Sequence, residues 1–338
     1  MVEYIRRNID EQLLAWKENP MRKPLLIRGA RQVGKSSAIK HLGSSFTYFA
    51  EVNFERNKAI KEFFQGDIDV HLICQKIANY INVPVEEGKT LLFLDEIQEC
   101  PEAIMALRFF KEDYPELHVI AAGSLLEFTL QELPTFGVGR IHSMFMYPMT
   151  FDEFLVANQE YGLIEMCGKA DCQHPLDTAF HNKLVELFRI YLLVGGMPEA
   201  VLAWVKTRNF INCRQIQEDI VLTYEDDFSK YKKRANPDLL RVTMRGVCHQ
   251  IGEKLTFRQI SSDYRSAQIR EAIRLLTLAG IVTPVVATSG NGVPLDAESD
   301  EDKFKLLFLD SGLLLSVLQL EGNLSQQLIE LIMTGSPQ

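Results

Sequence analysis

The sequence has no apolar run that approaches the roughly 20 residues required of a membrane-spanning helix. Residues 1–7 also lack the apolar centre of a secretory signal peptide. The six cysteines have no paired spacing, so we expect reduced thiols rather than a disulfide framework. A net charge of −9 argues against a protein coated in positive charge, although a local basic stripe can still bind nucleic acid. These absences favour a cytoplasmic globular protein with no membrane segment.

A phosphate-binding pattern stands between an apolar run at 24–27 and a helix-compatible stretch at 37–40. It reads Gly-Ala-Arg-Gln-Val-Gly-Lys-Ser, and its glycines let successive backbone N–H groups turn inward around a polyphosphate. We predict that Lys35 reaches the β- and γ-phosphates of ATP and that Ser36 supplies a hydroxyl ligand to Mg²⁺. The alternative is an ordinary glycine-containing strand-to-helix turn. The predicted nucleotide-binding residues are Gly29, Ala30, Arg31, Gln32, Val33, Gly34, Lys35, Ser36 and Ser37.

Residues 90–96 form a second motif, a buried-type strand that ends in two adjacent carboxylates. Ligands bind at the carboxyl ends of parallel strands, so we expect Asp95 to emerge beside the phosphate loop. Asp95 is predicted to support Mg²⁺ from the outer coordination shell, and Glu96 is predicted to be the general base that deprotonates the attacking water. The alternative is a pair of acids that solvate the end of a strand.

Two more polar residues are candidates for catalysis. Ser124 follows a predicted strand and could sit between the γ-phosphate and the attacking water, but Ser124 and Glu127 also have the spacing of a helix capping box. Arg140 lies on a glycine-loosened loop, where it could stabilise transition-state charge in its own subunit or in a neighbouring one. A solvated loop cation is the other interpretation of Arg140.

The order of elements predicts an α/β protein, with a P-loop NTPase parallel sheet that carries helices on both faces. An amphipathic helix is expected at 3–16, before the first strand. Further helical stretches are expected up to Phe63, at 70–80 and at 102–111. The predicted strands are 24–27, 47–54, 90–96, 119–122 and 143–147.

A mostly helical region is predicted to follow, with helices at 180–193 and 198–205 separated by Gly195, Gly196 and Pro198. Three helices and two strands then suggest a winged-helix-like module; they are predicted at 237–251, 257–262, 268–278, 281–287 and 304–309. The predicted domains are an ATPase core at 1–158, a helical lid or connecting region at 159–232, the winged-helix-like module at 233–322 and a tail at 323–338.

Gln268, Arg270 and Arg274 would contact double-stranded DNA if the third helix of this module entered a major groove. The basic run at 230–234 would add affinity for the phosphate backbone, although such a run also fits a solvated helix face. The acidic run at 296–302 would be repelled by phosphate if it faced the groove. DNA is therefore one candidate partner, and packing or contact with another protein is the alternative for the same helices.

Cys167, Cys172 and His174 fall close together in the sequence, with Asp171 between them. A zinc site uses four ligands, usually beginning with cysteines two to four residues apart, and no fourth ligand is evident. We therefore interpret residues 168–175 as a polar surface loop.

Taken together, these motifs resemble the archaeal-ATPase-like group of AAA-type P-loop ATPases, whose C-terminal part is a domain of unknown function. The segments at 122–124, 139–140 and 147–154 also resemble this group. More particular to it are Gly-Gly-Met-Pro-Glu at 195–199 and Asp-Ser-Gly-Leu at 310–313. The resemblance implies an ATP-binding core, a helical lid and a winged-helix-like module. Similar proteins usually continue into a nuclease-like domain, whereas this chain ends at residue 338, so it is either shortened or naturally short.

These observations predict an Mg²⁺-dependent ATPase whose turnover drives a conformational change or the binding of a macromolecule, with a homo-oligomer as one arrangement. A low-turnover, ATP-bound switch or scaffold is the alternative, and a small-molecule kinase is a rival enzyme class. ATP is favoured over GTP because the guanine-reading Asn-Lys-x-Asp pattern does not occur. The nearest match, at 57–60, has Ile60 where the acid is needed.

Overall fold

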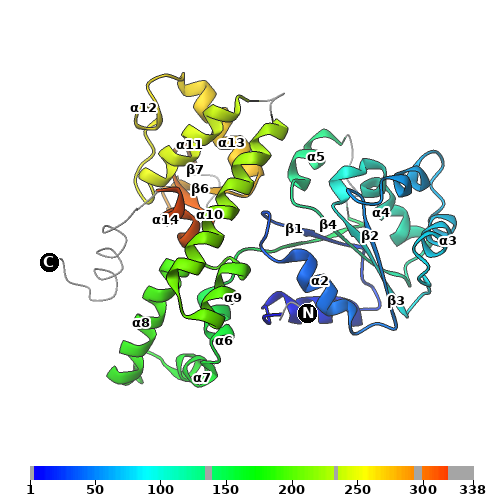
Figure 1. Cartoon of the computed structure of the whole chain (residues 1–338), viewed down its shortest axis with the longest axis horizontal. Helices are drawn as coiled ribbons and strands as arrows, with labels where there is room; N and C mark the ends of the chain where they lie inside the picture. Colours follow the sequence, from blue (N-terminus) through cyan, green and yellow to red (C-terminus); the bar gives the residue numbers. More distant parts are fainter. Residues whose placement is uncertain (1–3, 134–138, 232–234, 293–298, 319–338) are drawn as a thin grey trace. The chain divides into compact units, whose positions relative to one another are not determined.

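The computed structural model describes residues 4–133, 139–231, 235–292 and 299–318. The chain divides into two compact units, Met1–Tyr147 and Pro148–Gln338. In Figure 1 the first unit runs from blue to green, and the second continues from green to red. None of the helices in these described ranges is both long and apolar enough to cross a membrane.

A parallel sheet of five strands forms the centre of the first unit, in the order β2-β3-β4-β1-β5. Both β3 and β4 are buried along their whole length, as expected of strands covered by helices on both faces. The predicted parallel α/β sheet is therefore confirmed. The strands are β1 (Leu25–Arg28), β2 (Tyr48–Asn53), β3 (Thr90–Asp95), β4 (His118–Ala122) and β5 (His142–Phe145).

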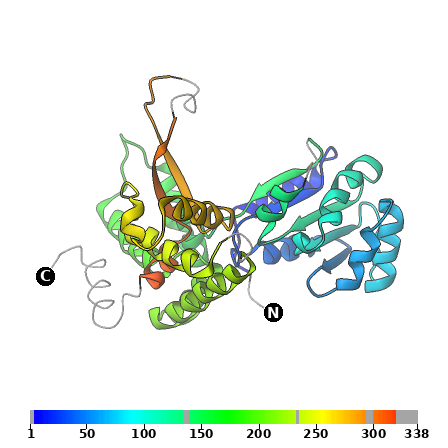
Figure 2. The same cartoon turned by 90° about the horizontal axis from the view of Figure 1, so that it is seen from above.

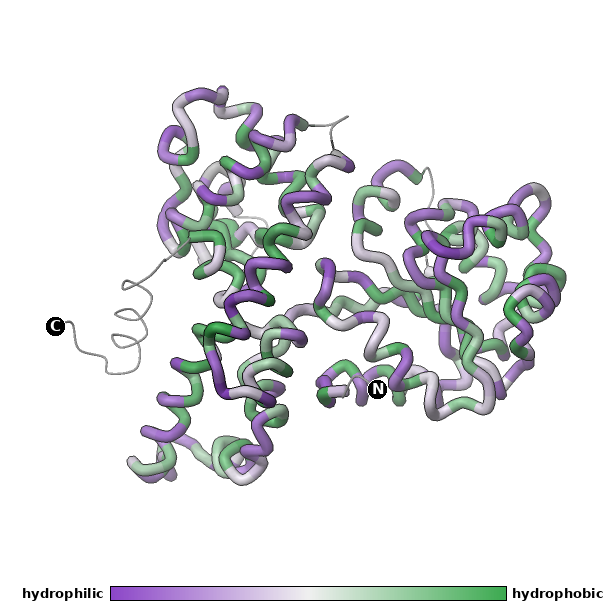
Figure 3. Tube along the Cα trace, viewed as in Figure 1, coloured by the Kyte–Doolittle hydropathy of each residue, from purple (hydrophilic) through white to green (hydrophobic). Residues whose placement is uncertain are grey.

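Helices cover the two faces of this sheet. One face buries Leu92 and Val119 in a cluster with apolar residues of α3 and α4. On the other face Trp16 of α1 packs edge-on against His118, with 5.8 Å between ring centroids. The helices alternate between hydrophobic and hydrophilic residues, green and purple in Figure 3, as amphipathic helices do. They are α1 (Ile9–Glu18), α2 (Lys35–Gly43), η1 (Lys58–Phe64), α3 (Val70–Ile81), η2 (Ile97–Glu99), α4 (Pro101–Asp113) and α5 (Leu126–Glu132).

The first helix begins later than predicted. It was expected from residue 3, yet α1 starts at Ile9, and the described residues before it are not helical. Asp10 explains the difference, because its Oδ2 accepts a hydrogen bond from the backbone N of Arg7 at 2.8 Å. The chain is thereby held in a turn where the apolar periodicity alone suggested a continuous helix.

The second unit is mostly helical, as predicted, with one antiparallel hairpin formed by β6 and β7. This hairpin follows α11, α12 and α13, the element order expected of a winged-helix-like module, and Figure 2 shows it in orange. The strand β7 begins at Ser299, earlier than predicted. The elements are α6 (Phe151–Ala157), α7 (Tyr161–Lys169), α8 (Thr178–Val194), α9 (Pro198–Thr207), α10 (Phe210–Asp227), η3 (Phe228–Tyr231), α11 (Pro237–His249), α12 (Phe257–Ile260), α13 (Ser266–Leu278), β6 (Val282–Thr288), β7 (Ser299–Phe308) and α14 (Ser311–Val317).

Two motifs that are distant in the sequence meet inside the second unit. Asp310 is buried at the start of α14, where its carboxylate accepts hydrogen bonds from the backbone N of Leu313 at 3.0 Å and of Gly196 at 2.5 Å. A Cβ at Gly195 would lie 2.2 Å from Asp310 Oδ1, so this position requires glycine. The Gly-Gly segment after α8 and the Asp-Ser-Gly segment at the start of α14 therefore form one structural junction.

Candidate functional site

The carboxyl ends of neighbouring strands bring the predicted site residues together. The phosphate loop follows β1, Ser124 follows β4, and Asp95 ends β3. Although β4 lies between β1 and β3, Ser36 in the first turn of α2 donates a hydrogen bond to Asp95 Oδ1 at 3.2 Å. The loop and the carboxylate are thus in direct contact across one intervening strand.

The backbone of residues 29–34 is shaped by positive φ angles at Gly29 (139°), Gln32 (62°) and Gly34 (98°). Gly29 also needs space, because a Cβ there would lie 2.1 Å from the carbonyl oxygen of Met146. Gly34 leads directly into α2, whose first turn has backbone N–H groups without helical partners. A tight loop that opens into a helix N-terminus is the geometry that binds phosphate groups.

Lys35 is buried inside this loop. Its Nζ donates hydrogen bonds to the carbonyl oxygens of Gly29 at 2.8 Å and Ala30 at 2.7 Å. Burial lowers the pKa of Lys35 to about 8, while the nearby Glu96 and Asp95 carboxylates act in the opposite direction. An anionic phosphate in the loop would favour the charged ammonium in the same way as these carboxylates do.

Asp95 and Ser36 have the chemistry of a magnesium site. Burial raises the pKa of Asp95, and the neighbouring Glu96 raises it further, whereas hydrogen bonds from Asn53 and Ser36 lower it. Mg²⁺ takes hard oxygen ligands and usually keeps several waters, so the hydroxyl could bind it directly while the adjacent carboxylate supports it through a water. A dication there would favour the ionised carboxylate. These residues therefore fit the ion.

Asn53 orients Asp95 and was not recognised from the sequence. At the end of β2, its Nδ2 donates to Asp95 Oδ2 at 3.0 Å. Its Oδ1 accepts from the backbone N of Glu55 and Arg56 at 3.1 and 3.0 Å, which fixes the amide. The sequence feature that could have identified Asn53 is its position, as a polar residue at the carboxyl end of a predicted strand.

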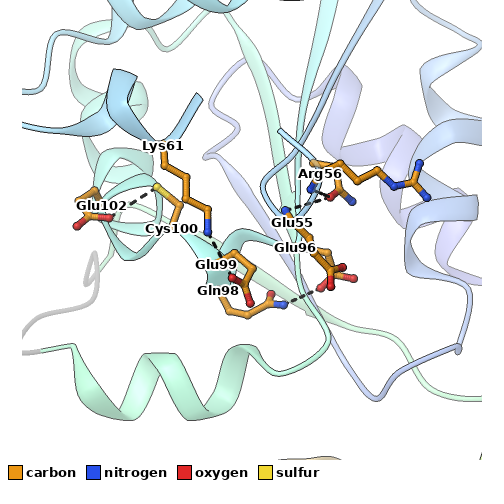
Figure 4. A network of polar contacts seen from close by, with 9 residues as sticks. Glu55, Arg56, Lys61, Glu96, Gln98, Glu99, Cys100 and Glu102 are labelled. Carbon is orange, nitrogen blue, oxygen red and sulfur yellow. Dashed lines mark hydrogen bonds and ion pairs between the residues drawn. The ribbon is translucent and has the colours of Figure 1, made fainter. Parts of the chain in front are cut away.

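Glu96 follows Asp95 with a left-handed backbone, at φ 49°. Its Oε2 accepts hydrogen bonds from Gln98 Nε2 at 2.6 Å, drawn in Figure 4, and from Ser124 Oγ at 3.4 Å. No sequence pattern selects Gln98 for this contact. The structure therefore places both Gln98 and Ser124 on the carboxylate of the predicted general base.

The capping-box interpretation of Ser124 is wrong. The N-cap of α5 is Leu125, and no side chain caps this helix. Glu127, the expected partner in the box, instead forms an ion pair with Arg28, whose Nε donates to its Oε1 at 2.6 Å. A guanidinium that binds both carboxylate oxygens is a stronger partner than a backbone N–H.

Arg140 is not brought to this site. It precedes β5, which runs parallel to β1, so it lies at the amino-end edge of the sheet, whereas the phosphate loop lies at the carboxyl-end edge. Its guanidinium forms an ion pair with Glu112 near the end of α4. Part of the loop in which Arg140 was predicted, residues 134–138, lies outside the described residues.

Arg7 contacts the phosphate loop from the segment before α1. Its Nη1 donates to the carbonyl oxygen of Val33 at 2.9 Å, and its Nη2 donates to that of Tyr147 at 2.8 Å. The side chain is buried, so the loop backbone is fixed by a guanidinium. No sequence pattern marks an arginine in this role.

The three candidate DNA contacts lie on α13, and each has an intramolecular partner. Gln268 Oε1 accepts from the backbone N of Arg265 at 3.1 Å in a capping arrangement. Arg274 binds both carboxylate oxygens of Glu271, at 2.7 and 2.8 Å. The Arg270 guanidinium lies 5.5 Å from the centroid of the Phe257 ring.

The charged runs near this module are only partly described. Lys230 pairs with Asp227 at 2.8 Å, and Asp300 pairs with Lys303 at 2.9 Å. Residues 232–234 of the basic run and 296–298 of the acidic run lie outside the described residues.

The cysteine and histidine cluster lies on a helix end and a polar turn. Cys167 is in the last turn of α7, which extends further than the predicted loop allowed, and Cys172 follows it. Asp171 Oδ1 accepts from the backbone N of Gln173 and His174 at 2.8 and 2.6 Å, so it shapes a turn. Within the described residues, no three His, Cys, Asp or Glu side chains gather in a metal-binding arrangement.

Comparisons with known proteins identify two regions of the chain. A family model for the AAA domain matches residues 21–155, and one for a domain of unknown function matches residues 185–324. A Walker-type ATPase of Pyrococcus abyssi is similar in fold, with a TM-score of 0.54 and 12% identity over 93% of this chain and 96% of that one. The structure of the Drosophila origin recognition complex bound to DNA aligns over 93% of this chain and 95% of that one, with 11% identity. Its TM-score of 0.32 is too low to indicate a shared fold. No curated protein sequence matches.

The family model covers the phosphate loop, both carboxylates and the sheet that positions them. The second model covers most of the helical unit, including the junction around Asp310. The chain therefore carries an AAA-type P-loop ATPase domain, followed by a C-terminal domain of unknown function.

Proposed function

We propose that residues 29–37 and Asp95 bind Mg²⁺–ATP and that Glu96 activates water to hydrolyse it. The observation that carries this proposal is the 3.2 Å hydrogen bond from Ser36 to Asp95. It joins the phosphate loop to the end of β3, and Glu96 is the next residue along the chain. GTP is disfavoured because Ile60 lies in the buried core, where the guanine-reading pattern would need an exposed acid.

The backbone N–H groups of residues 30–36 and the Lys35 ammonium would bind the β- and γ-phosphates. Mg²⁺, held through Ser36 and Asp95, would neutralise charge on the phosphate oxygens. Glu96 would take one proton from a water molecule while the water oxygen bonds to the γ-phosphorus. The bond from the γ-phosphorus to the bridging oxygen breaks, and ADP leaves with that electron pair. Ser124 would help to hold Glu96 through its hydrogen bond to Oε2.

Hydrolysis in the first unit would drive a conformational change that another macromolecule senses. A protein partner is favoured over DNA, because Gln268 and Arg274 on α13 already bind groups of their own helix. A homo-oligomer is one form of this partnership. In that arrangement Arg140 would act on a neighbouring subunit, since it lies at the opposite edge of its own sheet.

The test is ATP turnover by the full chain with Mg²⁺, alone and with double-stranded DNA, beside the Glu96→Gln variant. We expect turnover well above about one ATP per protein per hour. The variant should lose about 10²- to 10⁴-fold in kcat, because an amide cannot accept the proton. Its affinity for ATP should remain within about threefold of the wild-type value, because Glu96 is not assigned to phosphate binding.

Each other outcome has a definite meaning. Wild-type turnover in Glu96→Gln would contradict the assignment of the base. ATP binding without turnover in the wild-type chain would favour the switch or scaffold alternative. ATP turnover that rises when DNA is added would favour DNA, rather than a protein, as the partner.

A further inference from the structure

Gln98 contacts the proposed general base from the short helix η2. Its Nε2 donates to Glu96 Oε2 at 2.6 Å, the shorter of the two hydrogen bonds to this carboxylate (Figure 4). The other donor, Ser124 Oγ at 3.4 Å, binds the same oxygen. Within the described residues no hydrogen bond reaches Glu96 Oε1. One carboxylate oxygen is thus held while the other is left to accept a proton.

The carboxamide of Gln98 has only one possible orientation at this place. The reversed amide would point its oxygen at the Glu96 carboxylate, and two acceptors cannot share a proton. In the observed orientation Gln98 Oε1 is buried without a hydrogen-bond partner in the described part of the chain. Such an orphaned oxygen is costly to bury, so packing alone does not explain a glutamine here.

Gly123, at the end of β4, makes room for this side chain. A Cβ at residue 123 would lie 2.0 Å from Gln98 Oε1 and 3.2 Å from Gln98 Cδ. The third nearest heavy atom also belongs to Gln98, its backbone N at 3.7 Å. The φ angle of Gly123 is not positive, so the backbone itself would accept alanine. Glycine at position 123 therefore leaves room for the side chain of Gln98.

We propose that Gln98 is a positioning residue for water activation. It fixes Glu96 by binding Oε2, so that Oε1 faces the attacking water in a defined geometry. This inference rests on the proposed function, because it assumes that Glu96 is the base. It adds a residue that acts through Glu96 and touches neither phosphate nor metal.

The decisive variant is Gln98→Met, which keeps the length of the side chain and removes both the donor and the orphaned oxygen. We expect kcat to fall by about ten- to a hundred-fold, the effect of losing one hydrogen bond to a charged group. The dissociation constant of a fluorescent non-hydrolysable ATP analogue should stay within about twofold. The urea midpoint should not fall, because no buried polar group is left unpaired. A role in packing alone would instead leave kcat unchanged.

A second pair of variants tests the geometry. Gly123→Ala should lower kcat about ten-fold or more, because the added methyl displaces the end of the Gln98 side chain from Glu96. The urea midpoint of the nucleotide-free protein should change little, because the atom displaced, Oε1, lies at the end of a flexible side chain and has no hydrogen-bond partner among the described residues. In a Gln98→Ala background the same change should alter neither quantity, since the clashing side chain is gone. Gly162→Ala is the matched control, because a Cβ there meets no atom within 4 Å.

Two results would overturn the inference. Wild-type or raised kcat in Gln98→Met, with Glu96→Gln inactive in the same assay, would leave the proposed function standing and remove the role of Gln98. An effect of Gly123→Ala that persists in the Gln98→Ala background would show that the displaced group is not Gln98. If Glu96→Gln itself kept wild-type turnover, the proposed function would fail first.

Discussion

At Lys35, the proposed ATP binding and folding stability make opposite demands. The lysine needs its charge to bind phosphate, yet burial lowers its pKa to about 8, which means that the folded protein disfavours the ammonium. The carbonyl oxygens of Gly29 and Ala30 compensate in part by accepting its hydrogen bonds. A buried lysine at this position is therefore better explained by the binding of a phosphate ligand than by a contribution to folding stability.

Replacing Lys35 by alanine should therefore weaken ATP binding without weakening the fold. We expect the dissociation constant for ATP to rise about 10- to 100-fold, as for the loss of a charged hydrogen bond. The urea midpoint of the nucleotide-free protein at pH 7 should stay at or above the wild-type value. Titration with a fluorescent ATP analogue and urea unfolding measure the two quantities.

Lys40→Ala is the matched control for this prediction. Lys40 lies on the same helix, α2, but it is exposed and pairs with Glu51 at 2.9 Å. Its loss should leave ATP affinity unchanged. Equal affinity for ATP in Lys35→Ala and in the wild type would refute the assignment of the phosphate loop.

The residues that sequence could predict are those whose chemistry demands a fixed spacing. Lys35, Ser36 and Asp95 belong to motifs in which one residue type is needed at one offset. Arg7 and Gln98 act through contacts that only the folded chain creates, so no local pattern identifies them. Sequence thus identified the residues that are proposed to bind phosphate and metal, and it missed the residues that support them through tertiary contacts.

At the scale of elements, β4 begins with a histidine that couples stability to pH. His118 packs between Trp16 and Phe46, at 5.8 and 4.9 Å between ring centroids. Its Nε2 lies 3.1 Å from the carbonyl oxygen of Lys17, and its Nδ1 is buried with no partner among the described residues. Burial is the main cause that lowers the pKa of His118 to about 4.

The first unit should consequently lose stability as the pH falls from about 6.5 towards 4. In this range the unfolded chain binds a proton that the folded chain does not, so protonation favours unfolding. The histidine should contribute a loss on the order of 1 to 3 kcal/mol by pH 4. Urea unfolding at pH 7, 5.5 and 4.5, followed by Trp16 fluorescence in a Trp204→Phe background, measures it.

His118→Phe is the control, because it keeps an aromatic ring between Trp16 and Phe46 and cannot titrate. Other acids titrate in the same range, so the difference between the two proteins isolates the histidine. Parallel stability curves of the variant and its parent across this range would contradict the prediction.

The strands were predicted correctly where every residue is buried and most of them are apolar. The strands β3 and β4 are buried throughout and appear in the sequence as short apolar runs. The helix α10 was not predicted, although its buried positions Cys213, Gln217, Ile220 and Tyr224 follow helical spacing. A buried glutamine weakens the apolar pattern of that face, and its role is tertiary: Gln217 Nε2 binds two carbonyl oxygens at the end of α8.

The order of strands could not be predicted for a similar reason. Sequence shows that β1, β3 and β4 are strands, but not that β4 lies between the other two. That order depends on which helix packs on which face, and it decides that Ser124 of the β4 end reaches Glu96. Fold class was therefore predictable, whereas the neighbours of the site were not.

At the scale of the whole molecule, each compact unit contains one tryptophan, so the two units can be followed separately. Trp16 is buried in the first unit, where its Nε1 donates to the carbonyl oxygen of Lys23 at 2.8 Å. Trp204 is buried in the second unit, stacked on Phe210 at 4.6 Å between ring centroids. Variants that keep one tryptophan each report the unfolding of one unit.

If the conformational change that we propose extends from the first unit to the second, nucleotide should change the stability of both. In Trp204→Phe, Mg²⁺–ATP at about 100 times its dissociation constant should stabilise the Trp16-reported unit by about 2.7 kcal/mol. In Trp16→Phe, the Trp204-reported urea midpoint should also rise, by a smaller amount that measures the coupling between units. Both shifts should disappear when Lys35→Ala is added. An unchanged Trp204-reported midpoint, beside a raised Trp16-reported one, would mean that ATP binds to the first unit and the second unit does not respond. The idea that the change extends to the second unit would then be withdrawn, while ATP binding remained.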